Sequence, residues 1–305
     1  MKDKLKKTRV VSSTESEYPK RLKKIEKAAH RVYVRGNIPD NTALHIAIVG
    51  TRKASPLGKN YAYDLAKTLA QHNCVVVSGL ALGIDTCAHQ GCLDGGGQTI
   101  AVLANGVDTI YPSSNIKIAD RIMEDSGCVL SEYPDQTPAY PNQFIARNKI
   151  IAGLSDAIVI IEAPKQSGAL STAMYAREQK KPVYVVPGAP DAFLYQGSLE
   201  LIRSGARLIR NAKDLFCDIP LLPQGDNKIS FKTSKALSSK SGLSDIVYAT
   251  ICASPSPLSV DKLVTLTKLD AQAIAQKITY LIMDDLVKDL GNGTYCSNTS
   301  SHNYF

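Results

Sequence analysis

The chain has 305 residues, which is long enough for one large α/β core and a small additional domain. Hydrophobic residues make up 44% of it and charged residues 21%, a composition that excludes an intrinsically disordered protein. The net charge of +8 comes from residues 1–35, which have twelve basic and four acidic side chains, because the rest of the chain carries 24 of each kind. A binding site in the core therefore has to be found from local residue patterns.

The sequence also lacks the features of secreted and membrane proteins. It contains no apolar run of about 18 residues, and its basic N-terminus has no apolar segment of the kind that signal peptides need. The seven cysteines are scattered and odd in number, which favours reduced thiols over a disulfide framework. We therefore expect a cytoplasmic protein that does not bind a membrane.

Residues 1–42 are interpreted as a basic N-terminal arm and entry segment. A basic arm raises the rate at which a protein associates with nucleic acid. A solvated terminus explains the same charge equally well, so both interpretations stay open.

Residues 43–220 alternate short apolar runs with amphipathic segments. The apolar runs are rich in β-branched residues, which is typical of buried parallel strands, and the segments between them have helical spacing. This alternation predicts an α/β domain with a Rossmann-like, doubly wound parallel sheet. The predicted strands are 45–50, 74–79, 99–105, 127–131, 157–162 and 182–187, and the predicted helices are 57–72, one from about 84, 116–125, 143–153 and 171–180.

The C-terminal part differs in composition. Residues 221–242 are crowded with Pro, Gly, Ser, Lys and Asn and are interpreted as an interdomain linker. Residues 243–297 show three helical segments followed by a hairpin, which is the order of a small winged-helix domain. Because residues 243–296 include four Lys and six Asp, this domain is poorly suited to a DNA groove. We expect it to contact protein or to support a dimer.

The unusual residues of the α/β domain follow its predicted strands. In a parallel sheet, ligands bind outside the carboxyl ends of the strands, where turns and helix N-termini meet. Glycine and serine turns offer backbone N–H groups to an anion there, and Arg and Lys add positive charge. Such a site suits a chain of phosphates. The candidate nucleic-acid-binding residues are Gly50, Thr51, Arg52, Lys53, Ser78, Gly79, Phe144, Arg147, Asn148, Lys149, Ser167, Gly168 and Thr172.

Each of these segments also has a plain structural explanation. Ser-Gly turns before helices are common N-caps, Arg52 fits a surface salt bridge, and Phe144 fits a hydrophobic core. The prediction of a site rests on all four segments meeting at one edge of one sheet.

Several catalytic and metal-binding patterns are missing from the sequence. It has no phosphate-binding P-loop, no dinucleotide fingerprint after the first strand, and no G-x-S-x-G elbow. Its histidines, cysteines and carboxylates show no metal-ligand spacing. Asp85 and His89 lie one helical turn apart and are interpreted as a helix cap with a surface pair. We therefore expect a protein that is not an enzyme and needs neither metal nor cofactor.

Seven motifs occur in order between residues 45 and 210. They are Gly50-Thr-Arg52, Ser78-Gly79-Leu-Ala-Leu-Gly83-Ile-Asp85 with Ala88-His89, Gly106-Val-Asp108 followed by Tyr111-Pro112, Ser131-Glu132-Tyr133-Pro134, Phe144-x-x-Arg147-Asn148-x-Ile150-Ile151-Ala152-Gly153-Leu154-Ser155, Ser167-Gly168 with Thr172-Ala173, and Pro187-Gly188. In these motifs the chain resembles the DNA-processing protein A (DprA/Smf) family. It departs from the family at Ile145, where a proline is common, and at Lys149, where a second arginine is common.

The resemblance implies a bacterial competence factor of natural transformation. Members of this family bind incoming single-stranded DNA, protect it and load the RecA recombinase, and they form homodimers through the Rossmann-like domain. Carried over by motif, the candidate residues given above would line the DNA pocket. Lys149 keeps the charge but not the planar fork of an arginine, which would weaken its hold on a phosphate.

Two other functions compete with this one. The first is a nucleotide-binding or nucleotide-hydrolysing enzyme of the lysine-decarboxylase-like (LOG) type, which has a similar Rossmann sheet. Its Pro-Gly-Gly-x-Gly-Thr stretch is missing here. The second is a regulator that reads duplex DNA through its winged helix, against which the acidic C-terminal domain argues.

Overall fold

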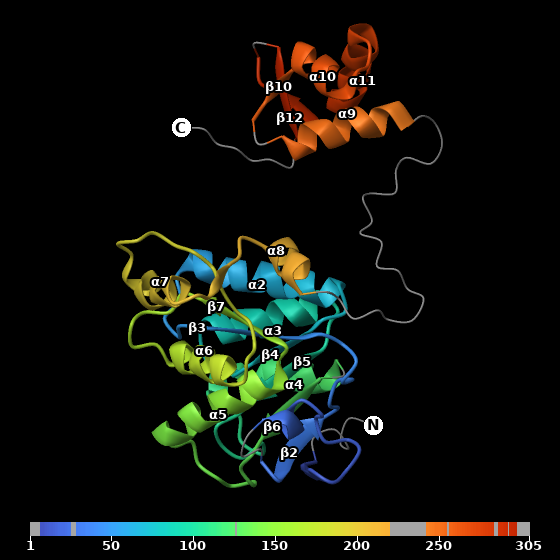
Figure 1. The fold of residues 1–305 in the computed structure, drawn as a ribbon. Helices are drawn as coiled ribbons and strands as arrows, with labels where there is room; N and C mark the ends of the chain where they lie inside the picture. The colour runs from blue at the N-terminus through green and yellow to red at the C-terminus, as the bar shows by residue number, and fades with distance from the viewer. Residues whose placement is uncertain are drawn as a thin grey trace. The chain divides into compact units, whose positions relative to one another are not determined.

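The structure is a computed structural model that describes residues 7–25, 29–125, 127–219, 242–254, 256–283, 286–291 and 293–297. The chain forms two compact units, Met1–Asp226 and Asn227–Phe305 (Figure 1). The predicted linker, residues 221–242, lies outside the described residues except for Gly242, where a helix of the second unit begins.

A nine-stranded sheet forms the centre of the first unit, with the order β1-β2-β6-β5-β4-β3-β7-β8-β9. The strands from β6 to β9 in that order pair in parallel, as predicted. The chain moves outward in one direction from β3 and in the other from β7, so the switch point lies between these two strands. The parallel strands are β3 (His45–Gly50), β4 (Val75–Ser78), β5 (Thr99–Val102), β6 (Cys128–Ser131), β7 (Ala157–Ile161), β8 (Val183–Val185) and β9 (Arg207–Leu208).

The N-terminal segment differs from the separate basic arm that the charge suggested. Residues Arg9–Ser12 form β1 and Arg31–Gly36 form β2, and both belong to the sheet because β2 pairs antiparallel with β6. Alternate residues of these strands point into the core, and the Tyr18 side chain between them is fully buried. The hydrophobic period of two, rather than the charge, decides the structure of this segment.

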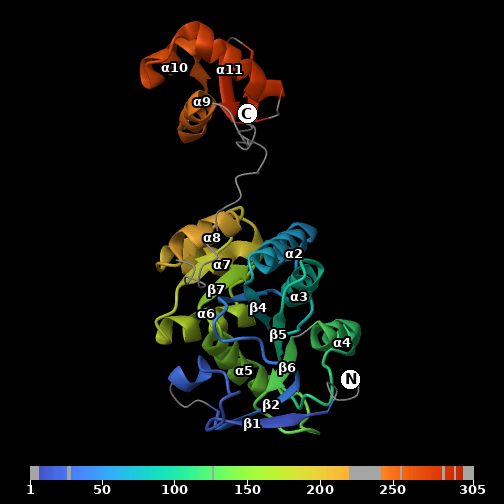
Figure 2. The same cartoon turned by 90° about the vertical axis from the view of Figure 1, so that its right-hand side faces the viewer.

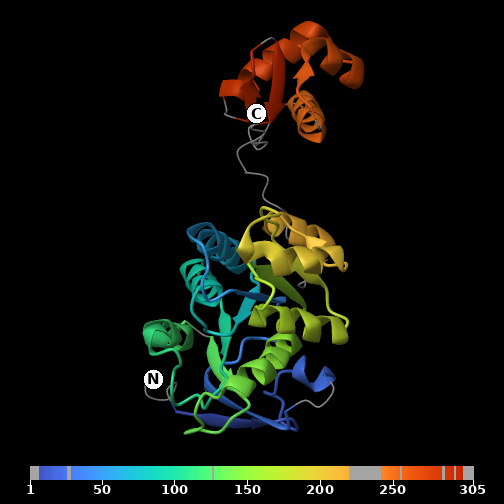
Figure 3. The same ribbon diagram turned by 90° about the vertical axis from the view of Figure 1, so that its left-hand side faces the viewer.

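Helices cover both faces of the sheet, as a doubly wound fold requires. One hydrophobic cluster contains residues of α5 and α6, and two others contain residues of α2, α3, α4 and α8 on the opposite face. Figures 2 and 3 show the sheet between these two layers. The helices are α2 (Pro56–Gln71), α3 (Ile84–Asp94), α4 (Ile116–Glu124), α5 (Pro141–Leu154), α6 (Gly168–Glu178), α7 (Gln196–Arg203) and α8 (Ala212–Asp218), with short 3-10 turns η1 (Leu22–Lys24), η2 (Ser113–Asn115) and η3 (Phe193–Tyr195).

The second unit has the predicted order of three helices followed by a hairpin. Its helices are α9 (Gly242–Ala253), α10 (Val260–Thr267) and α11 (Ala271–Met283). A short strand, β10 (Leu258–Ser259), which was not predicted, joins β11 (Val287–Asp289) and β12 (Thr294–Ser297) in an antiparallel sheet with the order β10-β12-β11. The helices and the sheet share one small core.

Within the described ranges, no helix is long and apolar enough to cross a membrane. The seven cysteines are unpaired, and Cys74, Cys92 and Cys128 are buried.

Candidate functional site

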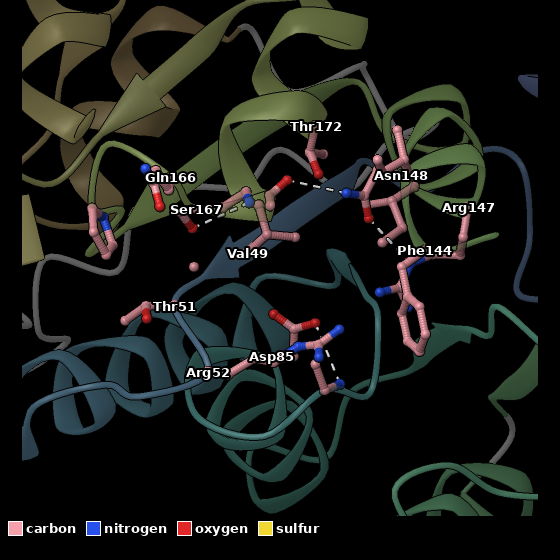
Figure 4. A pocket seen from close by; sticks show the side chains of 17 residues that line it. Val49, Thr51, Arg52, Asp85, Phe144, Arg147, Asn148, Gln166, Ser167 and Thr172 are labelled. Carbon is pink, nitrogen blue, oxygen red and sulfur yellow. Dashed lines mark hydrogen bonds between the residues drawn. The ribbon is translucent and has the colours of Figure 1, made fainter. Parts of the chain in front are cut away.

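A pocket of about 360 Å³ lies at the carboxyl end of the sheet, at the switch point between β3 and β7 (Figure 4). Its walls come from the turns after β3, β4 and β7 and from the facing sides of α5 and α6. The structure therefore brings the four predicted segments together. Nine of the candidate residues line the pocket: Gly50, Thr51, Arg52, Phe144, Arg147, Asn148, Ser167, Gly168 and Thr172.

Arg52 is the exposed cation of the pocket. It follows the tip of β3, and its guanidinium carbon lies 4.9 Å from the centroid of the Phe144 ring. A guanidinium group over an aromatic face is held in place while its N–H donors remain available to an anion. The neighbouring Lys53 is exposed but does not line the pocket.

The turn after β7 leads into the N-terminus of α6. The Ser167 hydroxyl caps this helix by accepting a hydrogen bond of 3.3 Å from the N–H of Ala169. A methyl group added at Gly168 would meet nothing within 4 Å, so the space in front of this turn is open. Acceptors within the protein are recorded for the N–H groups of Ser167, Ala169 and Leu170, whereas none is recorded among the described residues for the N–H of Gly168. This one donor and the partial positive charge of the helix N-terminus lie beside the open space.

Asn148 fixes this turn from the side of α5. Its amide nitrogen donates to the Gly168 carbonyl at 3.1 Å, a contact that can be followed in Figure 4, and to the Ser171 hydroxyl at 2.8 Å. Since Asn148 is 8% exposed and its hydrogen bonds are used within the protein, it orients the α6 turn.

Arg147 lines the pocket, as expected, but its side chain is buried and its charge is engaged within the protein. Its Nη1 donates to the carbonyls of Gly79 and Val102, each at 2.6 Å, and its Nε donates to the Asn148 side-chain oxygen at 3.1 Å. Burial lowers the pKa of Arg147 to about 10, while the nearby Asp85 partly opposes this effect. Its donors hold the turn after β4 against β5.

The turn after β4 was expected to offer free N–H groups to an anion, and this prediction is wrong. The Asp85 carboxyl accepts hydrogen bonds from the N–H groups of Gly79, at 3.1 Å, and Ala81, at 3.4 Å. The buried Ser78 hydroxyl donates to the Ile48 carbonyl at 2.6 Å. An internal carboxyl group therefore takes the place that an external anion would need.

Asp85 and His89 do not form the expected surface pair, because both are buried. Thr99 Oγ1 donates to the Val76 carbonyl at 2.7 Å, so it accepts the 2.8 Å hydrogen bond from His89 Nδ1. His89 Nε2 has no partner among the described residues, and burial, with Arg147 nearby, lowers the pKa of His89 to about 3. Burial also raises the pKa of Asp85 above its ordinary value.

Two glycines have a different role from the ligand approach that was expected. A side chain at Gly50 would collide with the Ile161 carbonyl of β7, and one at Gly79 would collide with the Arg147 guanidinium group. These glycines allow close packing inside the protein.

Glu162 is a buried carboxyl group that the sequence did not single out. It accepts hydrogen bonds from the Ser55 N–H at 2.8 Å, from the Ser55 hydroxyl, and from the Tyr195 hydroxyl at 3.1 Å. Its carbonyl accepts from the Thr51 N–H at 2.8 Å. Glu162 therefore joins the turns after β3, β7 and β8. Its position in the sequence, an acidic residue directly after an apolar strand, could have identified it as a buried carboxyl group at this edge of the sheet.

The pocket lining includes none of the remaining candidates, which are Lys53, Ser78, Gly79 and Lys149. Gln166 lines the pocket and was missed, although it directly precedes the Ser167-Gly168 turn.

Comparison with known proteins identifies the family. Residues 9–220 match the family model of DNA recombination-mediator protein A. The chain is 42% identical over 197 residues to protein Smf of Synechocystis, which covers 64% of this chain and 48% of that protein. It is 37% identical over 208 residues to DNA processing protein DprA of Bacillus subtilis, which covers 67% of this chain and 69% of that protein. The chain thus spans about half the length of the Synechocystis relative.

Two solved structures share the fold. That of DprA from Streptococcus pneumoniae has a TM-score of 0.66 and 34% identity, and the match covers 71% of this chain and 76% of that one. That of DprA from Helicobacter pylori, which describes the single-stranded DNA binding mode of that protein, has a TM-score of 0.62 and 30% identity, with 70% and 95% of the two chains covered. With its sheet order, its rim motifs and its match over residues 9–220, the chain belongs to the DNA recombination-mediator protein A family, the family of the DprA and Smf proteins.

Proposed function

We propose that this protein binds single-stranded DNA in the pocket between β3 and β7, without catalysing a reaction. The observation that carries the proposal is the combination of the exposed Arg52 with the open N-terminus of α6 at Ser167 and Gly168. The first supplies a charged fork and the second supplies the N–H of Gly168 and the partial positive charge of the helix N-terminus, and both are suited to phosphate oxygens. The single-stranded DNA bound by the Helicobacter pylori relative supports the same choice of ligand.

The pocket's chemistry fits a polynucleotide better than a reaction centre. Asp85, a carboxyl group of the pocket lining, is buried and holds the turn after β4, and His89 is buried in a contact with Thr99. The Glu162 carboxyl is likewise engaged, by Ser55 and Tyr195. Phosphate contacts of this kind give affinity that does not depend on sequence and falls with salt. We expect modest affinity per protomer, since few cations line the pocket, and avidity from a homodimer.

The cellular role follows from the family. We propose that the protein protects incoming single-stranded DNA during natural transformation and loads the RecA recombinase onto it. A homodimer formed through the Rossmann-like unit would place two pockets on one assembly. We further propose that the acidic winged-helix unit contacts protein rather than DNA.

A gel-shift titration with single strand, duplex and free nucleotides, repeated across a salt series, tests the proposal. Single-stranded oligo-dT is expected to bind more tightly than duplex of the same length, with affinity that falls linearly on a log–log plot against salt. Nucleoside monophosphates are expected to compete weakly and to remain intact. Tighter binding of a free nucleotide than of oligo-dT, or hydrolysis of the nucleotide, would favour the LOG-type enzyme instead. Preference for duplex would favour a regulator.

A further inference from the structure

The Phe144 ring is already used by the protein. The guanidinium carbon of Arg52 lies 4.9 Å from its centroid and that of Arg147 lies 5.8 Å from it. The centroid of the Tyr111 ring lies 6.0 Å from that of Phe144, with an interplanar angle of 60°. A base that stacked on a ring face covered by Arg52 would have to displace the cation that the proposed phosphate site requires. Phe144 therefore acts first as the support that positions Arg52.

Tyr111 is an exposed aromatic residue whose ring lies next to that of Phe144. It lies in the segment after β5, and its side chain is 50% exposed although its ring touches that of Phe144. The described residues give the Tyr111 ring no cation partner. An exposed aromatic face next to a phosphate site is the arrangement on which unpaired bases stack.

The segment that carries Tyr111 is held firmly before it. The Asn105 side chain donates to the Thr109 carbonyl at 2.6 Å and to the Gly106 carbonyl at 2.9 Å. Asp108 accepts a hydrogen bond of 3.0 Å from the N–H of Gln136 in the turn after β6. The segment is therefore held by hydrogen bonds within itself and by one to the turn after β6.

The same segment is held after Tyr111 as well. The buried Asn115 side chain donates to the Leu80 carbonyl at 2.8 Å and to the Thr86 hydroxyl at 2.9 Å. Tyr111 is exposed and lies between the two buried side chains of Asn105 and Asn115. Because its backbone is already ordered, little conformational entropy is lost when a ligand binds to it.

We propose that Tyr111 is the stacking surface for a nucleobase of the bound single strand, and that Phe144 positions Arg52 for the adjacent phosphate. This inference rests on the proposed function. The strand would then leave the pocket between β3 and β7 past Phe144 and run toward the turn after β5. In this proposal Tyr111 contacts a base rather than a phosphate. DNA from which the bases have been removed therefore provides the decisive test.

The test uses the full chain and a dodecameric oligo-dT, with a matched oligomer whose sugars lack bases. Tyr111→Leu is expected to weaken oligo-dT binding about five-fold or more and to leave binding of the abasic oligomer unchanged, since stacking on an aromatic side chain contributes about 1 kcal/mol or more per base. Tyr111→Phe keeps the ring and is expected to bind oligo-dT within two-fold of the wild type. Tyr280, 53% exposed and in the second unit, gives the matched control Tyr280→Leu, which is expected to change neither affinity.

The proposal would be overturned if Tyr111→Leu weakened the binding of oligo-dT and of the abasic oligomer equally. It would also be overturned if Tyr111→Leu left the binding of oligo-dT unchanged. Ultraviolet cross-linking of wild type to a 5-iodouracil oligomer is a second measurement that does not depend on a variant. Cross-links at Tyr111 are expected, and cross-links confined to Phe144 would contradict the assignment. Failure of the proposed function itself is distinguishable, because then the wild type would bind neither oligomer.

Discussion

The turns after β4 and after β7 resemble each other in sequence, yet a carboxyl group of the protein already occupies only the first of them. Both contain Ser-Gly, and both lead toward a helix at the carboxyl edge of the sheet. After β4, the N–H of Gly79 donates to Asp85 and its carbonyl accepts from Arg147. After β7, the space beside Gly168 is open.

The difference teaches that an anion-binding turn is defined by what its N–H groups already contact. Asp85 follows the first turn by six residues and supplies the negative charge from within the protein. No carboxyl group is recorded in contact with the Ser167-Gly168 turn in the described part of the chain. One side of the pocket is therefore held by internal contacts, whereas the other is the side at which we propose that DNA binds, and the two sides should respond differently to mutation.

The largest expected effect is on the structural side. Asp85→Ala leaves the Arg147 guanidinium buried without its carboxyl neighbour and leaves two N–H groups unpaired. We expect the free energy of unfolding to fall by about 3 kcal/mol or more, because each buried N–H left without an acceptor costs about 1–3 kcal/mol and the buried Arg147 loses a neighbour that favours its charge. Urea denaturation followed by circular dichroism measures this. The control is Asp85→Asn, which keeps a hydrogen-bond acceptor and should lose less stability. If Asp85→Ala unfolded at the same urea concentration as the wild type, the Asp85 carboxyl would have no structural role.

The second effect is a pH dependence of stability from His89. Because its pKa is about 3 in the folded protein and 6.5 as the ordinary value, the unfolded chain takes up a proton below pH 6.5 that the folded protein refuses. Stability is therefore lost as the pH falls through this range, by about 2 kcal/mol over the first two pH units. Denaturation at several pH values should show a shallower dependence in His89→Gln than in wild type, with equal slopes above pH 7. Parallel curves below pH 6.5 would contradict the burial of a neutral His89.

The third effect is on the open side of the pocket. Arg52→Ala removes an exposed side chain and should leave the free energy of unfolding nearly unchanged, while weakening oligo-dT binding by about 1.5 kcal/mol or more, as expected for a charged hydrogen bond. Fluorescence anisotropy with labelled oligo-dT measures the affinity. Lys53→Ala is the matched control, since Lys53 is exposed but outside the lining, and it should have a smaller effect. Unchanged affinity of Arg52→Ala, with its circular dichroism intact, would refute the role of Arg52.

The smallest effect separates the helix cap from the anion site at Ser167. Ser167→Ala removes the cap of α6 and should cost about 1 kcal/mol of stability. Ser167→Asp restores a cap but places a negative charge at the open turn, so it should recover the stability while weakening DNA binding further. Thermal denaturation and oligo-dT titration of the two variants distinguish these effects. If Ser167→Asp bound DNA as well as wild type, phosphate would not lie at this turn.

Most of the first unit's fold could be predicted because its signals are local. The predicted strand 45–50 coincides with β3, and the predicted helix 57–72 differs from α2 by one residue at each end. The N-terminal strands were missed because twelve basic side chains in residues 1–35 obscure the alternation of buried Val32 and Val34 with polar neighbours. The gathering of four segments at one sheet edge was also predictable, since parallel topology places all strand ends of one polarity together.

The roles of individual site residues were less predictable. Arg52 and Arg147 are both arginines near a strand end or a helix start, and their sequence neighbourhoods do not tell which one faces solvent. The structure buries Arg147 against carbonyls of two strand ends, whereas Arg52 remains exposed over Phe144. Partners such as Gly79 and Arg147 are 68 residues apart, so no local pattern contains their contact.

By itself the sequence determined the order of strands and helices from β3 to β8, the edge of the sheet at which the unusual residues meet, and the motifs of the family, because periodicity and turn chemistry act over a few neighbouring residues. Only the tertiary structure decided which hydrogen-bond donors at that edge are free. A donor is available to a ligand when no internal acceptor reaches it, and whether the Asp85 carboxyl or the Gly79 carbonyl does so depends on how distant segments pack.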